Sequence, residues 1–138
     1  MRHGHPKTVT VSNQCIDAVD PQRLALFWES ALGWQRSSDD DPDDDGSEVW
    51  LEPAPDSAEA GRVTPLLLLR VPEPHVGKNR LHLDLRPDDQ DVEVARLEAL
   101  GATRSDVGQG PEVTWIVLAD PEGNEFCVLR ALRPTEAS

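Results

Sequence analysis

One segment of the sequence combines carboxylates at the spacing of a calcium-binding loop. Aspartates stand at 41, 43, 44 and 45, Gly46 follows, and Glu52 closes the pattern after five further residues. This order fits the EF-hand loop, whose carboxylate oxygens surround Ca²⁺. An EF-hand also needs a helix on each side, whereas strand-like residues flank this segment. We therefore interpret the acidic stretch 39–45 as a solvated hairpin loop, and weak binding of Ca²⁺ stays open.

Two tryptophans lie where they could contact a ligand. Trp50 and Trp115 fall in strand-like segments, from which an indole ring can stack on a planar molecule. Lys78 and Arg80 flank another such segment, where they either receive an anionic group of a ligand or are simply exposed. The sequence has no Ser-His-Asp order, phosphate-binding loop or nucleotide-binding fingerprint. Strand parity decides which tryptophan faces a pocket, and the sequence does not fix that parity.

The charge balance excludes two classes of partner. The 138 residues include 26 acidic and 13 basic side chains, which gives a formal net charge of −13. Such a field repels nucleic acid and anionic membranes, so we expect neither as a partner. The sequence shows no apolar run of membrane-spanning length and no signal-peptide core, and we expect a cytoplasmic protein. Cys15 and Cys127 form no CxxC pair and fit reduced, buried thiols.

Hydrophobic periodicity divides the chain into alternating strands and helices. A helix is predicted after Asp20-Pro21, because aspartate caps helices, proline suits the first turn and Gly33 ends the apolar pattern. A second helix is predicted over 88–100, ended by Gly101. The predicted strands span 9–18, 34–37, 48–52, 65–71, 80–86, 102–107, 113–119 and 125–132.

The two halves of the chain repeat one supersecondary unit at an offset of 68 residues. Asp20 falls on Asp88, and Arg36 falls on Arg104. The Ala-Leu-Gly that ends the first helix recurs at 99–101. Both segments run through a strand, an acidic cap, a helix and a further strand.

The repeat leads to a prediction for the whole fold. One unit cannot bury both faces of its sheet by itself, whereas two units side by side can curve into a cup that serves as a pocket. We therefore predict a single α+β domain over 1–138. Its two βαβββ modules, about 8–71 and about 79–132, form a cupped mixed sheet with the helices outside.

Three segments in a fixed order resemble a known superfamily. The Asp-Pro, Leu-Phe-Trp and Ala-Leu-Gly-Trp groups within 20–34 resemble the first helix of the glyoxalase / bleomycin-resistance / extradiol-dioxygenase (vicinal oxygen chelate) superfamily. Lys-Asn-Arg-Leu-His-Leu-Asp-Leu at 78–85 resembles the strand that opens the second half in its actinobacterial glyoxalase-like branch. Leu-Ala-Asp-Pro-Glu-Gly-Asn-Glu-Phe at 118–126 is similar to the final hairpin. The resemblance implies paired βαβββ modules, frequent dimerisation and, in the enzymatic members, one metal ligand from each of four strands.

The resemblance implies His or Gln, Glu, His and Glu as the ligands, and this sequence departs from that set. Gln14, or Asn13 if the register shifts by one residue, takes the first position and His82 the third. The strand 65–69 offers no carboxylate for the second position, and Cys127 stands at the fourth. Because hard divalent ions need carboxylates, we expect no metal cofactor. If a divalent metal is bound, Gln14, His82 and Cys127 are its ligands, and a softer ion such as Zn²⁺ suits them.

The preferred hypothesis is a homodimer that binds a small apolar or aromatic molecule in the cup without a metal. The candidate ligand-binding residues are Gln14, Trp50, His82, Asp84, Trp115 and Cys127. The alternative is a metal-dependent lyase, isomerase or dioxygenase with the atypical ligand set. A third hypothesis uses His82 or Asp84 as a general acid or base without metal, although we expect these side chains to point the same way without close contact. Whether the chain is an enzyme and which molecule it binds stay open.

Overall fold

The computed structural model describes residues 9–37, 43–105 and 114–135, and these contain two helices and eight strands. The first half comprises β1 (Gln14–Ala18), α1 (Pro21–Leu32), β2 (Gln35–Arg36), β3 (Glu48–Glu52) and β4 (Leu66–Arg70). The second half comprises β5 (Asp84–Leu85), α2 (Gln90–Leu100), β6 (Thr103–Arg104), β7 (Ile116–Ala119) and β8 (Glu125–Val128). Each half is therefore one βαβββ unit, as the repeat in the sequence predicts.

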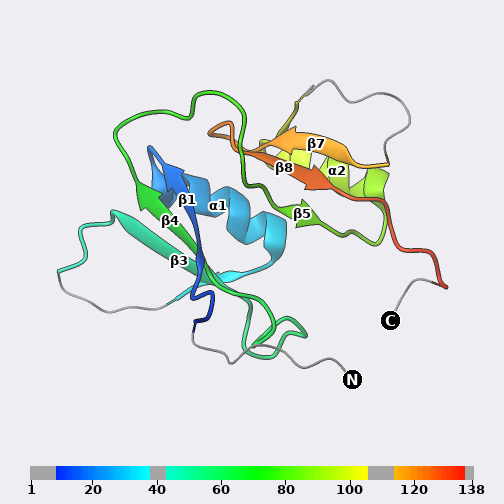
Figure 1. Cartoon of the computed structure of the whole chain (residues 1–138), viewed down its shortest axis with the longest axis horizontal. Helices are drawn as coiled ribbons and strands as arrows, with labels where there is room; N and C mark the ends of the chain where they lie inside the picture. Colours follow the sequence, from blue (N-terminus) through cyan, green and yellow to red (C-terminus); the bar gives the residue numbers. More distant parts are fainter. Residues whose placement is uncertain (1–8, 38–42, 106–113, 136–138) are drawn as a thin grey trace.

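Each half forms its own four-stranded mixed sheet. The strand order is β1-β4-β3-β2 in the first sheet and β5-β8-β7-β6 in the second. In both sheets the first strand runs parallel to the last strand of its unit, and the other pairs are antiparallel. Figure 1 shows the two sheets on either side of α1, with α2 behind β7 and β8. The predicted α+β class with paired modules is confirmed.

The ends of α1 lie where the sequence predicts them. The Asp20 carboxylate accepts a hydrogen bond of 3.1 Å from the backbone N–H of Arg23, and Pro21 occupies the first turn. Gly33 has φ of +67°, a left-handed conformation that glycine adopts without a Cβ clash. Its N–H closes the helix on the Glu29 carbonyl at 2.8 Å.

The second helix starts slightly later than predicted. Asp89, not Asp88, caps α2, because the Asp89 carboxylate accepts from the backbone N–H of Val92 at 3.1 Å. Arg96 of α2 reaches across to α1 and donates to the carbonyls of Ser30 and Ala31 at 2.9 and 2.8 Å. This guanidinium supplies donors to carbonyls that the end of a helix leaves without partners. The two modules are therefore joined helix to helix.

Several strands are shorter than predicted. The expected strand 80–86 forms a ladder only at Asp84–Leu85, and the expected 125–132 ends at Val128. β5 is an edge strand that pairs only with β8, so its length depends on one short partner. Before β5, the N–H of Asn79 bonds to the side chain of Glu125 instead of to a ladder carbonyl.

The hydrophobic core lies between the helices and one face of each sheet. The fully buried large side chains are Trp28, Phe126, Leu24, Leu51, Leu68, Leu97, Leu118, Val94 and Val128. The Trp28 ring packs edge-to-face on Phe126 and on Phe27, with centroids 5.1 Å apart in both pairs. Since Trp28 lies on α1 and Phe126 on β8, the core of the first module is continuous with that of the second.

A buried carboxylate joins the modules at the same point. Asp120 is 3% exposed and precedes the turn between β7 and β8. Its Oδ2 accepts from the indole N–H of Trp28 at 2.9 Å, and its Oδ1 accepts from the backbone N–H groups of Glu122 and Asn124 at 2.9 Å. The Asn124 side chain donates to both oxygens at 3.0 and 2.9 Å. Each oxygen is therefore compensated for the water it loses on burial.

The turn itself contacts the first module a second time. The Glu122 carboxylate accepts from the backbone N–H groups of Val19 and Asp20, at 2.6 and 2.9 Å. These donors lie between β1 and α1, and so Glu122 fixes the turn against the start of the first helix. The Asp-Pro-Glu-Gly-Asn turn thus serves both to connect β7 to β8 and to dock module two on module one.

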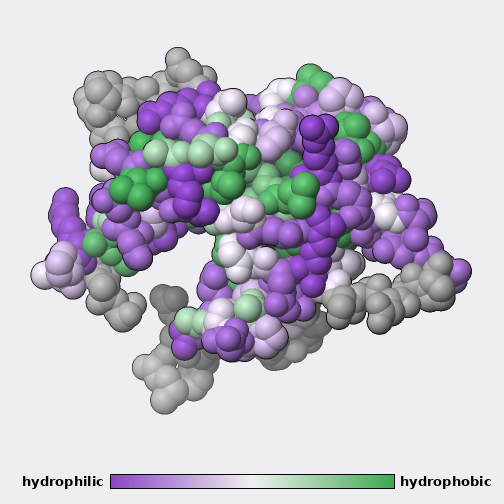
Figure 2. All heavy atoms as spheres, turned by 180° about the vertical axis from the view of Figure 1, so that it is seen from behind, coloured by the Kyte–Doolittle hydropathy of each residue, from purple (hydrophilic) through white to green (hydrophobic). Residues whose placement is uncertain are grey.

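No helix within the described residues is long and apolar enough to cross a membrane. Figure 2 shows hydrophilic residues over much of the face seen from behind, with hydrophobic residues between them in smaller groups. This surface agrees with a chain that carries twice as many acidic as basic side chains.

We predict that Trp28→Phe lowers the free energy of unfolding by about 3 kcal/mol, because it removes a buried donor from Asp120 together with packing volume. Trp34→Phe is the matched control, since the Trp34 indole N–H donates to Glu59 near the surface. It should cost less than about 1 kcal/mol. Urea unfolding measures both variants, and equal losses would contradict the role given to the buried bond.

Candidate functional site

The register of the second sheet separates its two faces. Asp84 lies opposite Cys127, which lies opposite Val117, so these three side chains share one face. The neighbouring residues Phe126 and Leu118 point to the other face, where they are buried in the core. The face of Cys127 is turned away from this core cluster.

A cavity of about 460 Å³ lies on this face. Its polar lining residues are Lys78, Asn79, His82, Asp84 and Glu125. Its other lining residues include Trp115, Val117, Cys127 and Leu129. Trp115 leaves 40% of its surface exposed, and the side chains of His82 and Asp84 are 43% and 51% exposed. The cavity therefore combines an aromatic wall with polar groups that a ligand can reach.

His82, Asp84 and Cys127 form a compact group in this cavity. His82 Nδ1 lies 3.1 Å from Asp84 Oδ1 and 3.9 Å from Cys127 Sγ. The expectation that His82 and Asp84 point the same way without close contact is wrong in its second part. Residues two apart on one strand share a face, and here the imidazole bends toward the carboxylate.

The thiol of Cys127 holds its proton firmly. Burial first, and then the charge and hydrogen bond of Asp84, raise the pKa of Cys127 from 9.0 to about 11. Glu125 raises this pKa further, whereas Lys78 lowers it. The thiol is thus protonated at neutral pH and is a poor nucleophile there.

His82, Asp84 and Cys127 do not form a catalytic triad, in which a nucleophile, a base and an orienting acid contact one another in that order. In such a triad, the imidazole contacts the nucleophile with one nitrogen and the carboxylate with the other. Here Asp84 and Cys127 both approach the same atom, Nδ1 of His82. The pair His82–Asp84 can orient the imidazole and present Nε2 to a ligand, and it does not activate Cys127.

The same three residues could hold a metal ion. Each of His82, Asp84 and Cys127 offers one ligand atom, and these three atoms lie within 4.8 Å of one another. A nitrogen, a sulfur and a carboxylate oxygen suit Zn²⁺, and three protein ligands are the number that open zinc sites use. Binding would have to displace the proton of the thiol, whose pKa burial and Asp84 hold at about 11. These three donors therefore fit a soft ion such as Zn²⁺, and binding it requires the Cys127 thiol to lose its proton.

Among its described residues, the first module adds no carboxylate to this set. β4 presents leucine at all of 66–69, and Arg70 ends it. On the face that carries Leu67, β4 pairs with Cys15 of β1 and Trp50 of β3. A hard divalent ion would therefore find one carboxylate in the group, that of Asp84, where such ions favour several oxygen ligands.

Gln14 and Trp50 lie apart from the cavity. Gln14 pairs with Leu66, which is buried against α1, and it lines a neighbouring recess of about 380 Å³ that His82 also lines. Asn13 donates to Cys15 Sγ at 3.3 Å. Trp50 lines a recess with the acidic loop. The structure thus brings together four of the six candidates, namely His82, Asp84, Trp115 and Cys127.

Glu125 is a cavity residue that the sequence analysis did not single out. Its Oε1 accepts from the N–H of Asn79 at 3.0 Å, and its Oε2 accepts from the hydroxyl of Ser105 at 3.2 Å. It lies two residues before Cys127, and the alternation of a strand places both on one face. This two-residue alternation along the strand is the signal in the sequence that could have identified Glu125.

The calcium-loop pattern is not an EF-hand. Asp44 and Asp45 accept from the backbone N–H groups of Gly46 and Ser47 at 2.8 and 2.9 Å. Ser47, through its side chain first, lowers the pKa of Asp45. The Ser47 carbonyl accepts from Arg70 N–H at 2.8 Å and so belongs to the sheet. Residues 39–42 lie outside the described part, while 48–52 form β3 rather than a helix.

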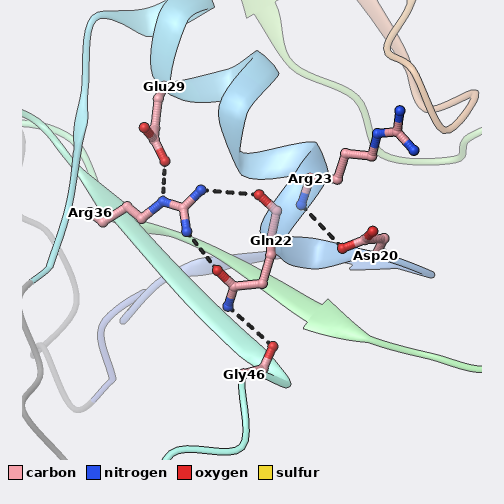
Figure 3. A network of polar contacts seen from close by, with 6 residues as sticks. All are labelled: Asp20, Gln22, Arg23, Glu29, Arg36 and Gly46. Carbon is pink, nitrogen blue, oxygen red and sulfur yellow. Dashed lines mark hydrogen bonds and ion pairs between the residues drawn. The ribbon is translucent and has the colours of Figure 1, made fainter.

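The end of this loop is tied to the first helix. Gln22 donates through Nε2 to the Gly46 carbonyl at 3.2 Å, and Arg36 donates to the Gln22 side chain at 2.6 Å (Figure 3). Arg36 also pairs with Glu29. Through these contacts the end of the loop is connected to β2, β3 and α1.

The model of a family described as a glyoxalase-like domain matches residues 13–129. We found no match among curated proteins. Among solved structures, the antibiotic-binding protein TnmS3 from Streptomyces sp. CB03234 has a TM-score of 0.61 and 23% identity, over 93% of this chain and 100% of that chain. The bleomycin-binding protein from Streptomyces verticillus, complexed with copper(II)-bleomycin, has a TM-score of 0.57 and 16% identity, over 92% of this chain and 100% of that chain.

A third similar structure was solved with a metal ion. The fosfomycin resistance protein FosX from Listeria monocytogenes, complexed with Mn(II), has a TM-score of 0.65 and 14% identity, over 91% of this chain and 93% of that chain. At these identities the similarity establishes a shared fold, and function has to be argued from the site.

We predict that iodoacetamide alkylates Cys127 slowly at neutral pH and faster as the pH rises toward 11, because only the thiolate reacts. Asp84→Asn should shift this rise to lower pH, since it removes a charge that raises the pKa of Cys127. The expectation that both cysteines are buried is wrong for Cys15, which is exposed and so serves as an internal control in the same mass spectra. Rapid labelling of both cysteines at pH 7 would contradict the assignment.

The same pKa shift has a consequence for stability. Because burial raises the pKa of Cys127 from 9.0 to about 11, the folded chain binds more protons than the unfolded chain between these values. Folding stability should therefore decline as the pH rises through that window. Cys127→Ser provides the comparison. An equally steep decline of stability in this variant would show that other groups cause the pH dependence.

Proposed function

We propose that this chain, which belongs to the glyoxalase-like domain family of the vicinal oxygen chelate superfamily, binds a small apolar or aromatic molecule without a metal ion. The ligand would occupy the cavity on the Cys127 face of the second sheet. The observation that carries the proposal is the 40% exposed ring of Trp115 in the lining of that cavity. An exposed indole beside polar side chains is typical of a stacking surface for a planar ligand.

The size of the cavity supports this proposal. A volume of about 460 Å³ falls in the range of small-molecule pockets. Val117 and Leu129 add aliphatic surface to Trp115, while Asn79 and His82 can orient a ligand by hydrogen bonds. A planar molecule of two or three fused rings is the class that such a cavity suits.

Proteins of the same fold give independent support. TnmS3 is described as an antibiotic-binding protein, and the Streptomyces verticillus protein was solved with copper(II)-bleomycin. Binding of a small organic molecule is thus a use of this fold. For the present chain it is an inference from the cavity and from these neighbours.

The residues at the ligand positions support metal independence. β4 offers leucine where a carboxylate would be needed, and Cys127 is a protonated thiol because burial and Asp84 raise its pKa to about 11. The carboxylate of Asp84 is already engaged with His82. A ligand that accepts or donates hydrogen bonds can use these groups as they are.

A second candidate function is a metal-dependent lyase, isomerase or dioxygenase. The convergence of His82, Asp84 and Cys127 within 4.8 Å favours it, and FosX of the same fold was solved with Mn(II). In that case these three residues, rather than Gln14, would hold the ion, which would supply Lewis-acid polarisation of a bound oxygen. Metal analysis of protein purified without chelator decides between the candidates. Stoichiometric metal that His82→Ala removes would overturn the first candidate.

We propose further that the chain acts as one domain and assembles as a homodimer in the cytoplasm. Superfamily resemblance supports the dimer, and sedimentation equilibrium tests it. A monomer at concentrations well above those of the binding assay would contradict this part of the proposal without affecting the cavity.

We predict that phenazine, a neutral planar probe, binds the protein in equilibrium dialysis and that Trp115→Ala weakens the binding about tenfold, through lost stacking and lost apolar surface. Trp50→Ala is the matched control, because Trp50 lines a recess in the other sheet. It should leave the affinity unchanged. Equal losses in the two variants, or no binding to the wild-type chain, would contradict the assigned cavity.

A further inference from the structure

The charges around the cavity define its ligand more narrowly. We propose that the ligand carries a cationic nitrogen, such as a protonated amine, on a planar aromatic body. The cation would lie beside Asp84 and Glu125, and the aromatic body against Trp115. This inference rests on the proposed function and names the ligand class for the same site.

Two carboxylates, those of Asp84 and Glu125, line the cavity. The Asp84 side chain is 51% exposed, so a ligand can reach it directly. The Glu125 oxygens accept from the backbone N–H of Asn79 and from the hydroxyl of Ser105. These donors are uncharged, and the hydrogen bonds fix the position of Glu125 without cancelling its charge.

A lysine and an imidazole must be weighed against these carboxylates. Lys78 lines the cavity, and His82 contacts Asp84 through Nδ1 at 3.1 Å. The lining holds two carboxylates, Asp84 and Glu125, and one lysine, so the carboxylates outnumber the lysine around the cavity.

The aromatic wall adds a second attraction for the same ligand. Trp is the side chain whose ring face attracts cations most strongly, and exposed examples contribute modestly. Trp115 is 40% exposed and lines the same cavity as the two carboxylates. An aromatic cation would gain from stacking and from charge at once, whereas an aromatic anion would meet repulsion. The wall and the charges thus select for one class of molecule.

The test compares three tricyclic probes of similar shape and different charge. Proflavine is cationic, phenazine is neutral and acridine carboxylate is anionic at neutral pH. The proposal predicts that affinity in equilibrium dialysis falls in that order, with proflavine about fivefold or more tighter than phenazine. It also predicts that added salt weakens proflavine binding and leaves phenazine binding unchanged.

The double variant Asp84→Asn with Glu125→Gln removes both charges and keeps groups that can accept the same hydrogen bonds. It should abolish the preference for proflavine over phenazine. Glu48→Gln is the matched control, because Glu48 is an exposed carboxylate on β3 that lines a different recess. It should keep the preference. Thermal unfolding confirms that each variant is folded, and the salt dependence of the wild type tests the proposal without any variant.

Different results would overturn the cationic ligand class and the binding function. Proflavine and phenazine of equal affinity, or acridine carboxylate as the tightest probe, would overturn the cationic ligand class while the binding function stands. Failure of all three probes to bind would overturn the binding function as well. A preference for proflavine that survives the double variant would assign it to another surface and would also overturn the proposal.

Discussion

The position of the binding face depends on one buried carboxylate. Asp120 holds the turn before β8 through two backbone N–H groups and binds the indole of Trp28 from the other module. A charge that loses water at 3% exposure is tolerated because every oxygen has donors. The turn therefore has one geometry, and β8 starts from a defined point. Glu125 and Cys127 follow within seven residues of Asp120 and inherit that position.

The same arrangement gives the second sheet a polar face opposite its core face. Its helix-facing side carries Phe126 and Leu118 and is sealed by the core around Trp28. Its other side alternates Glu125 and Cys127 on β8 and faces His82 and Asp84. In the first sheet the corresponding strand β4 is a run of leucines that ends at Arg70. The chain keeps the scaffold of its family.

Much of the fold could be predicted because local signals and global packing agree. The caps of α1, the Ala-Leu-Gly ends and the Asp-Pro-Glu-Gly-Asn turn each have one low-energy conformation. Strand lengths could not be predicted, because the extent of β5 depends on how far its single partner runs. The contact of His82 with Asp84 depends on rotamers, and the separate location of Trp50 depends on register. Neither is encoded by residue type alone.

The central claim is that the Cys127 face of the second sheet binds a small aromatic molecule without metal. Amide chemical-shift mapping during titration with phenazine, in the presence of a chelator, tests it most directly. The account predicts that shift changes concentrate in 78–85, 115–117 and 125–129 and that the affinity is the same with and without the chelator. Changes centred on β3 around Trp50, or binding that the chelator removes and Zn²⁺ restores, would contradict it.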